Sequence, residues 1–358
     1  MKEYITTFLI LFNLSLINSQ YTETINSNRP GSSVGAFSVG KNVLQFELGY
    51  ENSLYRHTQF NNSKISENDL NYVIRYGFLH NNLEVILDGE YSSNKINDFV
   101  KNKNFNNSYL GKQTIGLKFL IYDPFKNKKW HSVNLLSWKK NRNLKLTDFI
   151  PAISVYSGLN FIISEKKQYD DPYTLLKKNT VLEENEKSLN SKFGIIFQNH
   201  FLGKWVLVNN IYFDGLGNTY KDVNYITTLT HNFKNPRWSS FVEFEMIKND
   251  IYSDNYFKFG TAYLFNENFQ VDSSFGFNSK DTPSKINFSL GVSTRLDWYK
   301  DELPIDRKEK RSLKQKRKKE NKKIKSDYKL IRKQDKINKR FDRKESRLIK
   351  KNNRKNRK

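Results

Sequence analysis

A strict two-residue alternation of apolar and polar side chains is the feature that most constrains this chain. In residues 286–298, INFSLGVSTRLDW, the even positions are apolar except Thr294, and the odd positions are polar or Gly. Successive side chains of a β-strand point to opposite faces, so this segment forms a strand with one apolar and one polar face. The alternation therefore predicts an all-β protein with antiparallel strands.

The same alternation recurs along the chain in segments separated by Asn, Asp, Gly, Ser and Lys. Twelve segments fit the pattern, and four of them (149–163, 190–201, 204–214 and 223–233) fit it less cleanly. The segments are 43–51, 72–78, 83–91, 114–122, 149–163, 190–201, 204–214, 223–233, 242–246, 257–265, 269–277 and 286–298. An even number of strands of this kind is typical of a transmembrane, antiparallel, up-and-down β-barrel.

A soluble antiparallel sandwich would also alternate, but three features favour the membrane. The strands run to about 9–11 residues, longer than the usual ~5–6. Charged residues occupy the polar positions of many strands, as a wet lumen tolerates. Aromatic residues also cluster at strand ends, where interfacial girdles lie: Tyr50, Tyr91, Tyr122, Trp205, Trp238, Trp298 and Tyr299.

The connections between the predicted strands alternate in length. We expect tight turns near 79–82, 202–204, 233–236 and 266–268, and longer loops at 52–70, 92–112, 164–190, 215–222, 248–255 and 278–284. Short periplasmic turns and longer outer loops are typical of outer-membrane barrels. The link at 123–148 breaks this rule, because it lies on the short side and is long and basic.

The ends of the chain differ from the barrel in composition. Residues 1–20 read as a signal peptide, and 21–42 as a periplasmic or lumen-plugging lead. The barrel is expected over 43–299. A Lys/Arg-rich periplasmic tail, partly helical or disordered, is expected over 300–358. From Ile305 onward, 27 Lys and Arg face 7 Asp and Glu, so +20 of the net charge of +24 belongs to the tail.

The sequence resembles a known family from its lead to its final strand. The stretch INSNRPGSSVGAFSVGKNVLQFELGYE and the later FIPAISVYSGLNF, YLFNENFQVDSSFGFN and FSLGVSTRLDW resemble bacterial outer-membrane barrels of the "MetA pathway of phenol degradation" family, often labelled transporters. Arg29-Pro30 and the QFELGY strand match that family's opening. Asn28 and Gly31 replace two acidic residues that are typical there. The resemblance implies an outer-membrane barrel and transport.

Other motifs point to no chemistry. The stretch GAFSVGKN (35–42) has the look of a phosphate-binding loop, but a strand follows it where that motif needs Ser or Thr and a helix. The five His residues have no metal-ligand spacing, and Cys is absent, which excludes disulfides and thiolate sites. We therefore expect no enzyme, no cofactor and no metal.

The candidate functional residues are the charged side chains on the lumen side of the predicted strands. We expect most of them to pair with one another, which would fix the strand register and fill a narrow pore. A role in selecting solutes is the alternative. The predicted lumen-lining residues are Glu47, Arg75, Glu84, Asp88, Glu90, Lys118, Glu243, Glu245, Lys258, Asp272, Arg295 and Asp297.

Two functional classes follow from this pattern. The first is a passive channel or transporter for small solutes in the bacterial outer membrane, surrounded by its lipids. The second is a non-transporting structural or accessory subunit of an outer-membrane complex. It would dock through residues 305–358 onto a membrane or periplasmic protein, or onto peptidoglycan. Nucleic acid is not an expected partner, because the expected export would remove the tail from it.

Overall fold

The computed structural model describes most of the chain between residues 24 and 298. The described ranges are 24–58, 63–98, 103–126, 143–162, 189–217, 221–249 and 253–298. The chain divides into two compact units, Met1–Tyr299 and Lys300–Lys358. In the second unit the described residues are 328–329, 332–334 and 336, all helical. The predicted signal peptide and nearly all of the predicted tail lie outside the described residues.

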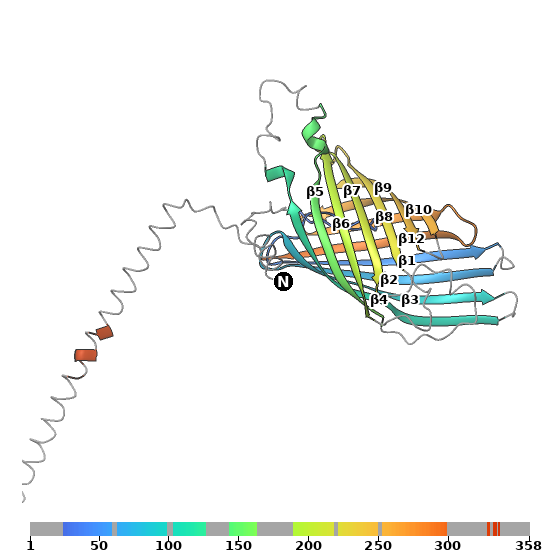
Figure 1. Ribbon diagram of the computed structural model, residues 1–358, viewed down its shortest axis with the longest axis horizontal. Coiled ribbons are helices and arrows are strands. Elements are labelled where there is room, and N and C mark those ends of the chain that lie inside the picture. The colour runs from blue at the N-terminus through green and yellow to red at the C-terminus, as the bar shows by residue number, and fades with distance from the viewer. Residues whose placement is uncertain are drawn as a thin grey trace, which may run out of the picture. The chain divides into compact units, whose positions relative to one another are not determined.

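The first unit is a closed barrel of antiparallel strands (Figure 1). Two short 3-10 helices, η1 (Pro124–Lys126) and η2 (Leu146–Phe149), lie in the link between the fourth and fifth strands. The strands are β1 (Val43–His57), β2 (Ser63–Gly77), β3 (Leu83–Asp98), β4 (Lys103–Tyr122), β5 (Ala152–Ile162), β6 (Leu189–Phe201), β7 (Trp205–Leu216), β8 (Asp222–Asn232), β9 (Trp238–Lys248), β10 (Ser253–Asn266), β11 (Phe269–Asn278) and β12 (Ser284–Asp297).

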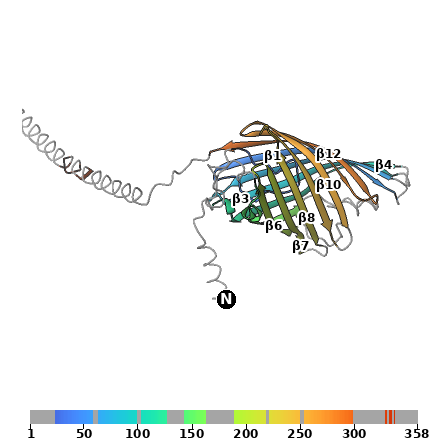
Figure 2. The ribbon, with the colours of Figure 1, turned by 90° about the horizontal axis from the view of Figure 1, so that it is seen from above.

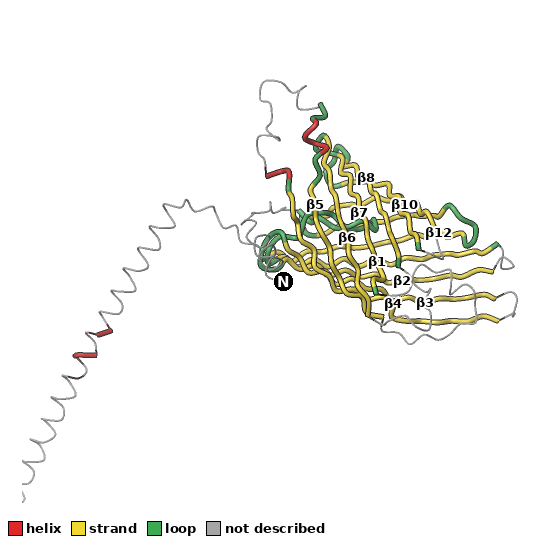
Figure 3. The backbone as a smooth tube through the Cα atoms, viewed as in Figure 1, coloured by secondary structure: helices red, strands yellow, loops and turns green. Residues whose placement is uncertain are grey.

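Each strand pairs with its neighbours in sequence, and β12 returns to pair with β1. The closing register runs from Val43 opposite Asp297 to Arg56 opposite Ser284. Figures 2 and 3 show the strands side by side around the ring. Closure satisfies the backbone hydrogen bonds of both outer strands, which is what a sheet needs inside a lipid bilayer. The predicted fold class, with twelve strands, is confirmed.

Burial in this barrel is the inverse of that in a soluble protein. On β1, Leu48 is 43% exposed and its neighbour Glu47 is 2% exposed. On β2, Arg75 is fully buried, whereas Tyr76 is 37% exposed. Apolar side chains therefore cover the outside of the ring and polar side chains fill its interior, so the chain is an outer-membrane β-barrel. No helix among the described residues is long and apolar enough to cross a membrane.

The first four strands are longer than the alternation predicted. The expected loops at 52–70 and 92–112 are wrong, because β1 continues to His57, β2 begins at Ser63, and β3 and β4 extend to Asp98 and from Lys103. These extensions are rich in Ser and Asn and have no apolar stripe. They remain strands because their backbones pair in continuous register, for example Ser53 with Glu67. Backbone pairing, which the alternation does not report, sets their length.

The link at 123–148 is long, as expected, and the register around it is now defined. β4 pairs with β5 from Lys112 opposite Ile162 to Tyr122 opposite Ile153, with an irregularity between Leu120 and Tyr122. The aromatic side chains of Tyr122, Trp205, Trp238 and Trp298 are exposed on the outside at this end of the barrel. Tyr50 and Tyr91 are also exposed, but they lie in the middle of β1 and β3, so the prediction that they end strands is wrong; Tyr299 lies outside the described residues.

Candidate functional site: the filled lumen

The lead segment, residues 24–42, lies inside the barrel. Its backbone and side chains hydrogen-bond with side chains from β1 to β7 and from β9 to β12. Only a segment enclosed by the ring can reach strands on all of its sides. The alternation of the strands places a polar side chain at each of these contacts, and the lead supplies backbone groups that need partners.

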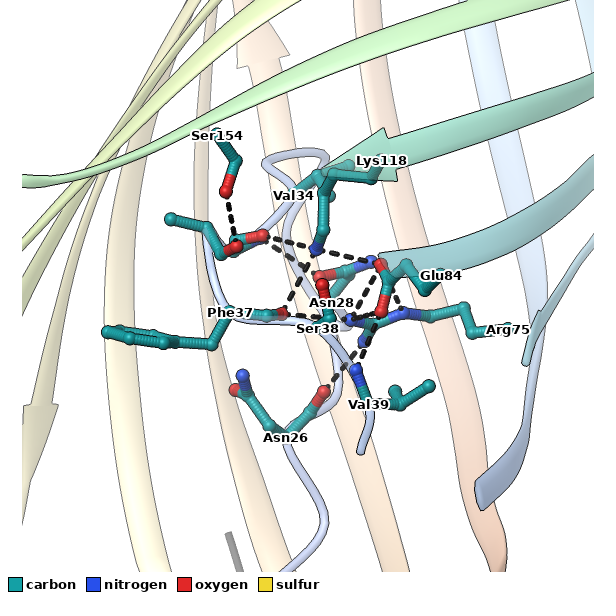
Figure 4. Close-up of polar contacts among 12 residues, drawn as sticks. Asn26, Asn28, Val34, Phe37, Ser38, Val39, Arg75, Glu84, Lys118 and Ser154 are labelled. Carbon is teal, nitrogen blue, oxygen red and sulfur yellow. Dashed lines mark hydrogen bonds and ion pairs between the residues drawn. The ribbon is translucent and has the colours of Figure 1, made fainter. Parts of the chain in front are cut away.

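The densest contacts form an ion network at Arg75, Glu84 and Lys118 (Figure 4). Arg75 Nη2 lies 3.1 Å from Glu84 Oε2, and Lys118 Nζ lies 2.7 Å from Glu84 Oε1. Arg75 Nη1 also lies 3.4 Å from Glu47 Oε1. All four side chains are fully buried. Adjacent strands β1 to β4 bring them together, because the inward position of each strand carries a charge.

This network holds the lead as well as itself. Lys118 Nζ donates to the carbonyl oxygens of Gly35 (2.6 Å) and Phe37 (3.0 Å). Arg75 Nη1 donates to the carbonyl oxygen of Asn26 (2.8 Å). Glu84 accepts a hydrogen bond from the backbone N–H of Val39 (2.7 Å). Charged donors and acceptors form the stronger class of hydrogen bond, so the network fixes the lead at one end of the lumen.

A second anchor lies across the lumen at Glu243 on β9. Its carboxylate accepts hydrogen bonds from the backbone N–H groups of Ser32 (2.9 Å) and Ser33 (3.2 Å), and from the hydroxyl of Thr228 (2.7 Å). Lys258 Nζ lies 3.8 Å from the same carboxylate and donates to the Ser32 hydroxyl at 2.8 Å. Glu243 therefore binds a turn of backbone, as a carboxylate binds at a cluster of N–H groups.

The third anchor is Arg29, which belongs to the lead itself. Its Nη2 lies 3.2 Å from Asp272 Oδ1 on β11. Asn28 and Gly31, which replace acidic residues of the family pattern, are both accommodated nearby. The side-chain oxygen of Asn28 accepts a hydrogen bond from the N–H of Gly35 (3.0 Å). A Cβ at Gly31 would lie 2.6 Å from Glu243 Oε2, so an acidic side chain there would meet a carboxylate.

Uncharged side chains provide further anchors that the sequence analysis did not single out. Asn210 on β7 accepts from the N–H of Val34 (2.7 Å) and donates to its carbonyl oxygen (2.9 Å). Gln198 on β6 accepts from the N–H of Ala36 (2.8 Å), and Ser154 on β5 donates to the Ala36 carbonyl (2.6 Å). Their inward position in the alternation is the signal in the sequence that could have identified them.

A cavity of about 390 Å³ remains beside the lead. Lead residues 28–32 and Val34 line one side of it. The strands line the rest, as far as Tyr55 on β1 and Lys285 on β12, close to the ends of those strands away from the lead. This volume is in the range of small-molecule sites. The lumen is therefore blocked at one level and open enough for a small solute at another.

The predicted lumen-lining residues fall into separate groups instead of one continuous path. Four of them form the network around Arg75, Glu243 pairs with Lys258, and Asp272 pairs with Arg29 of the lead. Arg295 Nη2 lies 3.4 Å from Asp297 Oδ2 at the end of β12. The remaining three line the cavity: Asp88, Glu90 and Glu245.

The structure also bears on the possible metal ligands and on the stretch that has the look of a phosphate-binding loop. Within the described residues, no group of three or more His, Asp or Glu could hold a metal ion. Residues 35–42 form part of the lead and run directly into strand β1 at Val43, without the helix that a phosphate-binding loop requires.

The chain matches one family of known proteins over most of its barrel. Residues 27–296 match the model of the family described as "Putative MetA-pathway of phenol degradation". That range begins within the lead and ends within β12. No curated protein matches the sequence.

Several solved outer-membrane proteins have a similar arrangement of strands. An outer membrane channel from Pseudomonas putida F1 is 10% identical, with a TM-score of 0.44, and the match covers 76% of this chain and 100% of that one. The translocator domain of the autotransporter NalP from Neisseria meningitidis is 8% identical, with a TM-score of 0.43, covering 72% and 89%. The CymD monoaromatic hydrocarbon channel is 8% identical, with a TM-score of 0.36, covering 73% and 90%. Likeness at this level identifies no solute for this chain.

Proposed function

Because the chain belongs to the family described as "Putative MetA-pathway of phenol degradation", and forms an outer-membrane β-barrel, we propose that it is a passive channel for small solutes. Its own residues 24–42 close the lumen in the structure described above. Solutes pass when this lead shifts or leaves. The proposed role is transport without chemistry.

The many polar contacts between lead and wall carry this proposal. The lead is held by hydrogen bonds to Arg75, Lys118, Glu243 and Asn210, and by the ion pair of its own Arg29 with Asp272. Water can replace such contacts when the segment moves, so the net free energy lost is about 0.5–1.5 kcal/mol for each neutral hydrogen bond and about 1.5–3 kcal/mol for each one to a charged group. The lead also makes apolar contacts, because Val34, Ala36 and Phe37 pack in a cluster with side chains of the wall that include Leu120 and Ile196. The remaining cavity of about 390 Å³ gives a solute room on one side of the lead.

The alternative is a non-transporting structural subunit. The observation in its favour is the completeness of the Arg75 network, in which each of the four charged side chains has a partner of opposite charge. Such a network serves equally well to stiffen a barrel that never opens.

Conductance across planar lipid bilayers separates the two functions. The full chain is compared with two separate variants. One lacks residues 24–38, and the other is Glu243→Ala, which removes the second anchor. A channel shows small, short-lived steps for the full chain and conductance several times larger for both variants. Thr294→Ala, on the lipid-facing side of β12, is the matched control and should resemble the full chain.

A bilayer that stays silent even with the lead removed would contradict the channel and support the structural subunit. Folding of each variant is checked by its heat-modifiable migration on a gel, so that a misfolded barrel is not counted as a closed one.

A further inference from the structure

The cavity beside the lead has an excess of acidic side chains. Its lining contains eight carboxylates and four cations, the latter being Arg29, Lys192, Lys258 and Lys285. Two of these cations also lie against carboxylates outside the lining, Arg29 against Asp272 and Lys258 against Glu243. This excess of carboxylates favours a negative electrostatic potential inside the cavity, which a narrow low-dielectric cleft strengthens.

The wall of the cavity already holds two ammonium groups against tyrosine rings. Lys285 Nζ lies 3.4 Å from Glu51 Oε1, with the ring centres of Tyr55 and Tyr256 at 5.4 and 5.3 Å. Lys192 Nζ lies 4.7 Å from the ring centre of Tyr212. Tyrosine faces attract cations through the quadrupole of the ring, and the attraction increases when the site is dry. Carboxylates and tyrosine faces thus line this cavity together.

Two carboxylates of the lining, Glu47 and Asp69, each have a buried oxygen with no hydrogen-bond partner, and Glu47 is already paired with Arg75. Asp69 lies directly opposite Glu51 in the pairing of β1 and β2, an arrangement of like charges that destabilises a sheet. Lys285 lies against Glu51, whereas Oδ1 of Asp69 is buried without a hydrogen-bond partner, and the whole residue is only 9% exposed. A buried carboxylate oxygen without a donor is costly, so this position favours an added cationic donor.

A polar atom of the lining on β7 is also unpartnered. The hydroxyl of Tyr212, on β7, is buried and has no hydrogen-bond partner, although the residue is only 5% exposed. Its ring packs edge-on against Tyr156 with centres 6.0 Å apart. Besides Asp69, the lining of this cavity therefore contains a further polar atom and an aromatic wall.

We propose that this cavity binds a small organic cation, whose ammonium group donates to Asp69 between β1, β2 and the lead. A metal ion fits less well, because the described residues contain no group of three or more potential ligands placed to hold one. An anion would be repelled by the excess of carboxylates in the lining. The inference rests on the proposed function, since it names the class of solute that such a channel would carry.

Calorimetric titration of the purified full chain in detergent tests the proposal. The probe is putrescine, a four-carbon diammonium, and the control ligand is 1,4-butanediol, which has the same shape without charge. Putrescine should bind saturably and butanediol should not. Asp69→Asn keeps the size of the side chain and removes its charge, and should weaken putrescine binding about tenfold, as expected for loss of a charged hydrogen bond. Glu267→Gln, an exposed carboxylate in the turn between β10 and β11, should change it less than about twofold, as distant exposed charges are screened.

A variant that is expected to strengthen putrescine binding shows that changes in affinity are not caused by misfolding. Lys285→Met removes the internal ammonium beside Glu51 and should strengthen putrescine binding, because it makes the cavity more acidic. Equal binding by Asp69→Asn and the unaltered chain, or no saturable heat with putrescine, would overturn the proposal.

The titration is independent of conductance. Conducting steps without putrescine binding would leave the channel standing and refute the cation site. Putrescine binding that depends on Asp69, in a barrel that never conducts, would support the cation site and refute the channel.

Discussion

Gly49 and Gly291 lie directly opposite each other in the pairing that closes the barrel, and the guanidinium of Arg29 fills the space above them. A Cβ at Gly49 would lie 2.0 Å from Arg29 Nη1, and one at Gly291 would lie 2.2 Å from Arg29 Nε. Contacts this short are excluded, so any larger side chain must displace Arg29. The glycines are required at this close approach and not for an unusual backbone angle.

The first prediction is that Gly291→Ala loosens the lead. The added methyl group pushes Arg29 from its place and weakens the ion pair with Asp272, now at 3.2 Å. Because the chain has no Cys, a single Val34→Cys reporter on the cavity-lining part of the lead can be labelled with a membrane-impermeant maleimide. Labelling should be several times faster with Gly291→Ala than without it. Equal rates would show that Arg29 does not hold the lead.

The second prediction concerns Glu243. Glu243→Ala removes the acceptor of the Ser32 and Ser33 N–H groups and leaves Lys258 without its carboxylate. Loss of one charged acceptor costs about 1.5–3 kcal/mol, so opening of the lead should become roughly tenfold or more frequent. The same Val34→Cys labelling measures it. Glu245→Ala, two residues further on the same inward face, is the control and should have a smaller effect; an equal effect would contradict specific anchoring by Glu243.

Much of the fold could be predicted from the alternation alone, because a two-residue period survives wherever one face meets lipid and the other meets water. It identified the number of strands and the inward position of Glu47, Arg75 and Glu243. It could not find the polar ends of β1 to β4, where Asp69 lies within an expected loop. There most outward side chains are polar, with Leu54 and Leu70 as exceptions, so the period gives only a weak signal.

The site was less accessible to sequence reasoning than the fold. Alternation places Asn210 and Gln198 inward, yet only the path of the lead decides that they bind its backbone. The space above Gly49 and Gly291 that Arg29 fills likewise depends on the register between the first and last strands. These two glycines are more than 240 positions apart in the sequence. A contact between residues so far apart leaves no pattern in the local sequence.

The third prediction is that Arg75 is essential to the stability of the barrel. Arg75→Met leaves the buried carboxylates of Glu47 and Glu84 without their guanidinium, and removal of one partner from a buried pair costs about 3–5 kcal/mol. Unfolding by urea in lipid vesicles, followed by Trp fluorescence, measures the loss. Arg237→Met, in the exposed turn between β8 and β9, is the matched control and should change the free energy of unfolding by less than about 0.5 kcal/mol. A similar loss in both variants would show that the effect is not due to burial of the network.

The fourth prediction is that the barrel folds without residues 305–358. The ring closes through β12, which ends at Asp297, and its pairing with β1 completes the backbone hydrogen bonds. The truncated chain should therefore keep its heat-modifiable migration and its resistance to urea. The removed residues include 27 Lys and Arg, and each cation near an anionic surface contributes about 1 kcal/mol at most, screened over about 8–10 Å. Co-purification with cell-wall and membrane material should accordingly fall at low salt and differ little at high salt. A truncated chain that fails to fold would show that the tail is part of the barrel's folding unit.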